Sequence, residues 1–102
     1  MKRELTCKER DLLYEELKAH LETFKDELEN HFPFVVAGNM ACRIASAIKD
    51  GEEKTEYIIK DYGVLNVGTL TYYRNSNTIV YDFKNGTHAS YPVTCLKEIV
   101  KE

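Results

Sequence analysis

Apolar residues recur every three or four positions over the first third of the chain, a spacing typical of an amphipathic helix. Thr6 and Glu9 have the spacing of a capping box at its start, and Pro33 disfavours helical backbone at the residue before it. The pattern predicts one long helix over about residues 7–31. Its core-facing side, within about 60° of Leu17 on a helical wheel, comprises Arg10, Leu13, Tyr14, Leu17, His20, Leu21, Phe24, Leu28, His31 and Phe32.

A second helical repeat predicts a shorter helix over about residues 40–50. Asn39 can cap its start, and Asp50-Gly51 ends the pattern. Residues 33–39 are interpreted as an apolar connector that lies under the core. Because the second helix is rich in alanine and allows close approach, we expect the two helices to form a hairpin packed on a sheet. Its apolar positions are Met40, Ala41, Ile44, Ala45 and Ile48.

β-Branched and aromatic residues dominate the chain after residue 54, which predicts strands. The first strand covers Thr55–Lys60, and a meander of three strands runs from Gly68 to Pro92. Its turns are a polar break at Arg74–Asn77 and the dipeptide Asn85-Gly86. Asn-Gly favours a two-residue type I′ turn, because both residues tolerate positive φ.

This turn sets the predicted register, which pairs Tyr81 with Ser90 and Val80 with Tyr91. A two-residue turn at the earlier break then gives the sheet one core face and one face that meets water. The core face is predicted to hold Leu70, Tyr72, Ile79, Tyr81 and Phe83. The other face would carry Tyr73, Val80 and Tyr91 together as an aromatic patch.

These elements predict an α+β fold in one domain, residues 1–102, with a helical part over 1–50 and a β part over 54–102. The antiparallel sheet should hold four or five strands, since residues 93–100 fit either a helical turn or a last strand. Over about the last 45 residues, the order of strands and turns resembles the closing half of small SH3-like or Tudor-like barrels, a likeness of fold pattern only. A sheet curled into such a barrel is therefore the alternative to an open one.

Composition is that of an ordinary soluble globular protein, with 43% hydrophobic and 30% charged residues. The net charge of −3 argues against binding to nucleic acid through bulk charge. No signal peptide and no apolar run of about 20 residues occurs, so we expect a cytoplasmic protein without a membrane span. Cys7, Cys42 and Cys95 are widely spaced and should be reduced thiols.

One side of the long predicted helix is acidic. Its acids within about a 60° arc are Asp11, Glu15, Glu22, Asp26 and Glu29. From residue 11 to residue 29 there are seven acidic and two basic residues, a local charge of −5. Two interpretations stay open. The face is either solvated, with Lys18 paired to Glu22 and Lys25 to Glu29, or it is a docking surface for a basic partner.

Catalytic and metal signatures do not occur in the sequence. His20 and His31 would lie about 16 Å apart on the predicted helix, too far to share an ion. There is no pair of cysteines at zinc-site spacing, no glycine-rich phosphate loop and no serine elbow. We therefore expect no enzyme activity, no metal site and no cofactor. The arrangement that would contradict this is Cys42 or Cys95 beside a histidine.

The function expected from these features is stoichiometric protein binding, as an adaptor, regulator or inhibitor. The binding residues would be Glu15, Glu22, Asp26 and Glu29, facing a partner with a basic surface. A small domain with an acidic helix would also suit an inhibitor of phage or mobile-element origin.

The alternative function is binding of single-stranded nucleic acid on the aromatic sheet face. Tyr73 and Tyr91 would stack on bases, with Arg74 and Lys84 near the phosphates. Homodimerisation through an edge strand or the first helix is compatible with either function.

Overall fold

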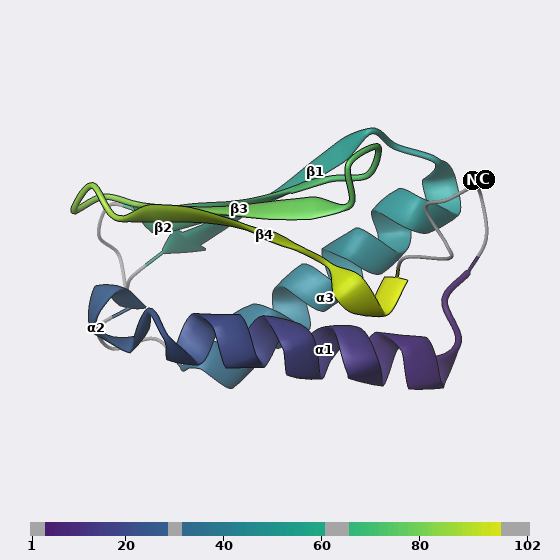
Figure 1. The fold of residues 1–102 in the computed structure, drawn as a ribbon, viewed down its shortest axis with the longest axis horizontal. Coiled ribbons are helices and arrows are strands. Elements are labelled where there is room, and N and C mark those ends of the chain that lie inside the picture. The colour runs from purple at the N-terminus through teal and green to yellow at the C-terminus, as the bar shows by residue number, and fades with distance from the viewer. Residues whose placement is uncertain (1–3, 29–31, 61–65, 97–102) are drawn as a thin grey trace.

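The structure, a computed structural model, describes residues 4–28, 32–60 and 66–96. It is an α+β fold with a layer of helices against a layer of strands (Figure 1). The helices are α1 (Cys7–Glu22), α2 (Lys25–Leu28), α3 (Pro33–Asp50) and the 3-10 helix η1 (Thr94–Leu96). The strands are β1 (Lys54–Lys60), β2 (Asn66–Tyr73), β3 (Thr78–Phe83) and β4 (His88–Pro92).

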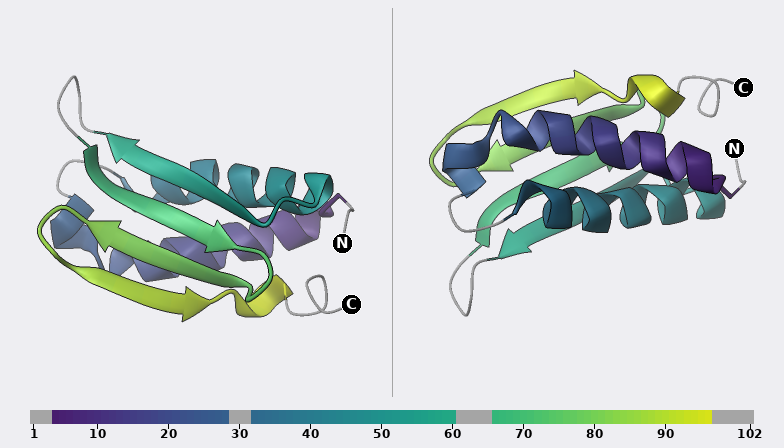
Figure 2. Two further views of the ribbon diagram at one scale, coloured as in Figure 1. Left: turned by 90° about the horizontal axis from the view of Figure 1, so that it is seen from above. Right: turned by 90° about the horizontal axis from the view of Figure 1, so that it is seen from below.

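The four strands form an antiparallel sheet in the order β1-β2-β3-β4, so β1 and β4 are its edges. α1 and α3 lie side by side on one face, and no described element covers the other face (Figure 2). The sheet is open, and the barrel is not found among the described strands. After β4 the chain forms η1 where a last strand was the alternative, and residues 97–102 lie outside the described residues.

The predicted capping box opens α1. Thr6 Oγ1 accepts a hydrogen bond from the Glu9 N–H at 3.1 Å, and the Glu9 carboxylate accepts one from the Thr6 N–H at 2.8 Å. Each residue thereby satisfies a main-chain N–H that the first turn of a helix leaves without a partner.

α1 ends at Glu22 rather than continuing to residue 31. Thr23 is the C-cap, and its hydroxyl donates to the His20 carbonyl at 2.6 Å. A hydroxyl that bonds main-chain carbonyls in this way favours a helix end. The prediction of one long helix is therefore wrong beyond Glu22. The short α2 follows, and residues 29–31 lie outside the described residues.

The predicted connector at residues 33–39 is helical and forms the start of α3. Pro33 takes the first helical position, where a missing N–H leaves no hydrogen bond unmade and a fixed φ suits the helix. Asn39, predicted as an N-cap, consequently lies within the helix. The C-terminal end agrees with the prediction, since Gly51 adopts the left-handed conformation with φ 74°.

The core lies between the helical layer and one face of the sheet. The first two helices and the turn between them bury Leu13, Leu17, Leu21, Phe24 and Leu28, and α3 buries Val36, Ala37, Met40, Ala41, Ile44, Ala47 and Ile48. The sheet buries Ile59, Leu70, Tyr72, Ile79, Tyr81 and Phe83, which confirms the predicted core face. Full burial of each large apolar side chain stabilises the fold by about 1.5–3 kcal/mol. Phe32, predicted on the apolar side, is instead 61% exposed.

The β3–β4 turn is one residue longer than predicted. The Phe83 N–H donates to the Thr87 carbonyl at 2.9 Å and the Gly86 N–H to the Phe83 carbonyl at 3.0 Å, which leaves a three-residue loop. Gly86 alone in this loop has positive φ, at 94°. A type I turn followed by a left-handed glycine has this geometry, and Asn85-Gly86 suits it as well as type I′.

That extra residue changes the pairing of β3 with β4. Tyr81 lies opposite Ala89, and Ile79 lies opposite Tyr91. The predicted pairs with Ser90 and Tyr91 are therefore wrong by one position. A one-residue shift moves every side chain of a strand to the other face, so Tyr91 lies on the helix-covered side.

The β2–β3 turn keeps the predicted register, with Leu70 opposite Tyr81. Its last residue, Asn77, is nearly buried and has φ 51°, a conformation that asparagine tolerates better than most residues. Its side-chain amide donates to the Val93 carbonyl at 2.7 Å, and its side-chain oxygen accepts from the Tyr72 hydroxyl at 2.9 Å. Asn77 therefore joins the turn to the end of β4 and gives the buried Tyr72 hydroxyl its partner.

Gly68 in β2 lies directly opposite Phe83 in β3. A Cβ at this position would come within 2.5 Å of Phe83 Cδ1 and 2.9 Å of the Asp82 carbonyl oxygen. The ring of Phe83 therefore occupies the space that a larger residue would need.

Gly68→Ala should lower the free energy of unfolding by about 1–3 kcal/mol, because the added methyl overpacks against a ring and a main-chain oxygen. Gly38→Ala in α3 is the matched control. Its Cβ would meet Tyr14 Cε1 at 4.0 Å, and alanine in a helix is favoured over glycine by about 1 kcal/mol. Urea denaturation of both variants gives the two values. Equal effects would contradict the close packing at Gly68.

Asn77→Ala should destabilise the fold by about 2–3 kcal/mol, because it leaves the buried Tyr72 hydroxyl and the Val93 carbonyl without a partner. Asn75→Ala, at an exposed position of the same turn, is the control and should change stability by less than about 0.5 kcal/mol. Thermal and urea unfolding measure both. A neutral Asn77→Ala would show that these two hydrogen bonds do not hold the turn to β4.

Candidate functional site

The predicted acidic face is exposed in the structure. Asp11, Glu15 and Glu22 lie on α1 and Asp26 lies on α2, all open to solvent and opposite the buried leucines of α1. Glu29, the fifth acid predicted for this face, lies outside the described residues. Three of the five acids, Asp11, Glu15 and Glu22, lie on one side of α1, and we call these three with the exposed Asp26 of α2 the acidic face.

The basic residues expected to pair with the acids of this face are Lys18 and Lys25. Lys18 and Glu22 are one helical turn apart, yet no ion pair joins them in the described part of the chain. Glu29, the partner predicted for Lys25, lies outside the described residues. The acidic face therefore presents carboxylates without the Lys18 pair that the solvated-face interpretation required.

The two predicted binding tyrosines lie on opposite faces of the sheet. Tyr73 is on the uncovered face and is 40% exposed. Tyr91 faces the helices, where its ring stacks on that of His20 with 4.5 Å between centroids. The predicted patch of Tyr73, Val80 and Tyr91 is therefore not formed.

Tyr91 instead completes an aromatic cluster between α1 and the sheet. Phe24 stacks on Tyr81 with 5.4 Å between ring centroids, and Tyr81 meets Tyr91 edge-on at 5.6 Å. His20 Nδ1 lies 2.8 Å from the Tyr81 hydroxyl, which is fully buried. Either group can donate in this hydrogen bond, depending on the tautomer of His20. Burial lowers the pKa of His20, and the nearby Glu16 carboxylate opposes that shift only partly.

Glu16, one turn before His20, holds the C-terminal segment on α1. Its carboxylate accepts hydrogen bonds from the Thr94 N–H at 2.9 Å, the Thr94 hydroxyl at 3.1 Å and the Cys95 N–H at 3.1 Å. These are the free N–H groups at the start of η1, where a negative charge is favoured. Burial raises the pKa of Glu16, but the hydrogen bonds from Thr94 and Cys95 outweigh it, and the net pKa lies below its ordinary value.

This cluster was not found from the sequence, where Glu16 counted only as one of the seven acids of the long helix. Its spacing of four residues from His20 on a helix was the available signal. The partners come from residues more than 60 positions away, which no local pattern indicates.

The cysteines and the possible metal ligands were compared with the chemistry that the sequence left open. Burial, with the neighbouring Glu16 carboxylate, raises the pKa of Cys95 to about 12, so its thiol stays protonated near neutral pH. Cys7, Cys42 and Cys95 are free. In residues 4–28, 32–60 and 66–96, no group of three or more His, Cys, Asp or Glu is placed to hold a metal ion.

The uncovered face of the sheet is rich in threonine. Along with Tyr73 it exposes Ile58, at 39%, and partly exposes Val80. Lys84, predicted to act with Tyr73, lies in the β3–β4 turn, at the opposite end of the sheet from Tyr73. This face therefore holds one exposed tyrosine, with Lys54 directly opposite it on β1 and Arg74 next to it in the chain.

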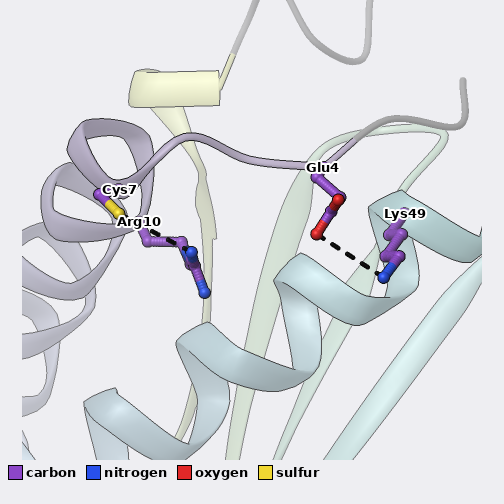
Figure 3. Close-up of polar contacts among 4 residues, drawn as sticks. All are labelled: Glu4, Cys7, Arg10 and Lys49. Carbon is purple, nitrogen blue, oxygen red and sulfur yellow. Dashed lines mark hydrogen bonds and ion pairs between the residues drawn. The ribbon is translucent and has the colours of Figure 1, made fainter.

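The segment before α1 crosses the end of α3 (Figure 3). The Glu4 carboxylate lies 3.6 Å from Lys49 Nζ, and Arg10 Nη2 lies 4.0 Å from Cys7 Sγ. Both members of the ion pair are more than half exposed, so it adds less than about 1 kcal/mol. Glu4, Arg10 and Lys49 also line a cavity of about 250 Å³ beside α3.

Comparison with known proteins identifies no relative: no family model, no curated protein and no solved structure matches the chain. Of the helices described, none is long and apolar enough to cross a membrane. The functional argument therefore depends on the surfaces of this chain alone.

The His20–Glu16 cluster predicts a loss of stability in acid in two steps. The pKa of His20 is lower in the fold than its ordinary value of 6.5, so the unfolded chain takes up more protons as the pH falls below about 6.5. The pKa of Glu16 is lower than its ordinary value of 4.5, so a second loss occurs below about pH 4.5. Both losses of stability can be measured as free energies of unfolding by urea denaturation at pH values from about 8 to about 3.

His20→Gln should remove the first step and Glu16→Gln the second. His88→Gln, at an exposed histidine of the β3–β4 hairpin, is the control and should leave the profile unchanged. A profile that keeps its first step in His20→Gln would show that another group is responsible.

Proposed function

We propose that the protein acts by stoichiometric binding to a partner protein with a basic surface, as an adaptor, regulator or inhibitor. The docking surface is the acidic face of α1 and α2. The observation that supports the proposal is that Asp11, Glu15, Glu22 and Asp26 are all exposed, the first three of them on one side of α1, while Lys18 forms no ion pair with Glu22 in the described part of the chain.

The acidic face is well suited to rapid recognition of a basic surface. The opposite side of α1 is fixed by buried Leu13, Leu17 and Leu21, so the carboxylates need no rearrangement before binding. Exposed charges of one sign steer an oppositely charged partner and raise the association rate. The proposal includes a cytoplasmic setting with reduced thiols, and it includes no catalytic step. An inhibitor of phage or mobile-element origin is one form of this function.

Binding of single-stranded nucleic acid has weaker support. That function needs successive aromatic rings and cations along one groove. Tyr91 packs against His20 on the helix side, and Tyr73 and Lys84 lie at opposite ends of the sheet. The remaining features in its favour are the exposed ring of Tyr73 and the two cations beside it, Lys54 and Arg74.

The test compares two double charge reversals with equal changes in net charge. Glu15→Lys with Glu22→Lys alters the acidic face, and Glu53→Lys with Asp82→Lys alters exposed positions of the sheet layer. Each tagged protein is used to capture partners from nuclease-treated extract of the native host. We expect the wild type and the sheet variant to retain a basic partner protein that the acidic-face variant loses.

With the partner purified, the loss should appear mainly in the association rate and shrink as salt is added, because screening acts over about 8 Å at physiological ionic strength. Folding should be nearly unchanged, since exposed charges contribute less than about 1 kcal/mol each. Equal capture by both variants, or a partner captured only from extract that was not treated with nuclease, would contradict the proposal.

A further inference from the structure

β1 is an edge strand whose outer side has no partner among the described strands. At its start the Arg74 N–H donates to the Glu53 carbonyl at 2.8 Å. Main-chain groups of an antiparallel strand alternate in direction, so the odd-numbered residues of β1 bond to β2. The N–H and carbonyl groups of Lys54, Glu56 and Ile58 therefore point away from the sheet.

The other edge is less available. β4 is five residues long and ends in Pro92, whose nitrogen carries no hydrogen to donate. The chain then enters η1, which the Glu16 carboxylate holds on α1. A free edge long enough to pair with another strand thus remains at β1, which has seven residues.

A groove of about 570 Å³ lies between α3 and β1. Its lining includes Asn39, Arg43, Ser46 and Asp50 of α3, and Thr55 and Tyr57 of β1. The C-terminal half of α3 emerges beyond the β1 edge when the sheet is viewed face-on (Figure 2, left). The groove therefore runs beside the unpaired main chain of β1, a combination that lets a domain bind an extended peptide between a helix and an edge strand.

The groove carries charge of both signs at defined places. Arg43 lies over the ring of Tyr57, with its guanidinium carbon 5.5 Å from the ring centroid, and no described carboxylate pairs with it. Asn39 donates to the Tyr57 hydroxyl at 3.1 Å, which leaves that hydroxyl free to donate outward. Asp50 and Glu52 line the groove at the end where β1 begins.

We propose that the groove between α3 and β1 binds an extended segment of a partner protein, which adds to β1 as a further antiparallel strand. Alternate side chains of that segment enter the groove. An acidic side chain opposite Tyr57 meets Arg43, and a basic one opposite Thr55 meets Asp50 and Glu52.

A single strand fits this edge better than a second copy of the chain. Pairing of β1 with β1 of a second copy would bring two α3 helices to the same side of one extended sheet. Both α3 helices would then have to be accommodated beside the joined edges, whereas a single strand needs room only for its own side chains (Figure 2). The site is separate from the acidic face of α1 and does not depend on the function proposed for that face.

The probe is an end-blocked, fluorophore-labelled peptide of seven residues with Thr at the odd positions and Val, Glu and Lys at the second, fourth and sixth. In antiparallel pairing with Lys60 to Lys54, its Glu faces Tyr57 and its Lys faces Thr55. A second peptide exchanges the Glu and the Lys. We expect the first to bind about tenfold more tightly by fluorescence anisotropy, since a charge complement of this kind is typically worth about one decade of Kd.

Arg43→Glu should reverse the preference between the two peptides, whereas Lys84→Glu, at an exposed position of the β3–β4 turn, should leave it unchanged. Circular dichroism confirms that both variants are folded. Methylating the third and fifth peptide nitrogens, which face β1, should abolish binding, and methylating the fourth and sixth should not.

Bound peptide should also slow alkylation of Cys42, which lines the groove, and leave Cys7 on α1 unaffected. Equal affinity of the two peptides, tighter binding of the exchanged peptide, or protection of Cys7 without Cys42 would each overturn the proposal. Dimerisation of the free protein that is blocked by Glu56→Pro would also overturn it, because the edge would then belong to a second copy.

Discussion

Burial of one face of the sheet under α1 and α3 is the constraint on which the rest of this structure depends. The open sheet has a continuous apolar surface made by Leu70, Tyr72, Ile79 and Tyr81, and a sheet of this size is not stable with that surface in water. The two long helices cover it with leucine, isoleucine and alanine side chains. Everything polar that enters this interface must then find a partner inside it.

Two buried tyrosines show how that requirement is met. The Tyr81 hydroxyl bonds to His20 of α1, and the Tyr72 hydroxyl bonds to Asn77 of the β2–β3 turn. The ring of each tyrosine packs in the core, and its hydroxyl forms a hydrogen bond to a second structural element. The helical layer and the end of β4 are thus positioned by hydrogen bonds as well as by apolar contact. Glu16 adds a third connection, from α1 to η1.

The same packing decides which surfaces remain for binding. Because one side of α1 lies in the core, the acids on its other side face solvent. Because α3 extends beyond the edge of the sheet, the outer edge of β1 stays unpaired and lies next to a polar groove. The acidic face and the groove differ in chemistry. One presents charge of a single sign on a convex helix, which favours fast encounter. The other offers main-chain hydrogen bonds and charges of both signs, which favour a defined extended ligand.

The sequence by itself determined the elements whose signals are local. The capping box at Thr6, the helix end at Gly51, the strand beginning near Thr55 and the apolar face of the meander all follow from period and cap chemistry, and the structure confirms them. The exposure of the acids of α1 was also predicted from the helical period alone, because side chains opposite the buried stripe of an amphipathic helix face solvent.

Only the tertiary structure decided the rest. Asn-Gly is compatible with a two-residue or a three-residue loop, and both loop lengths are common in β-hairpins. The three-residue loop was selected because it turns Tyr91 toward His20 and Phe24. A register shift of one residue is enough to move the Tyr91 ring from the solvent-facing side of the sheet into the aromatic cluster. The groove at β1 likewise arises from the angle between α3 and the sheet, which depends on the sum of many packed side chains and has no local pattern in the sequence.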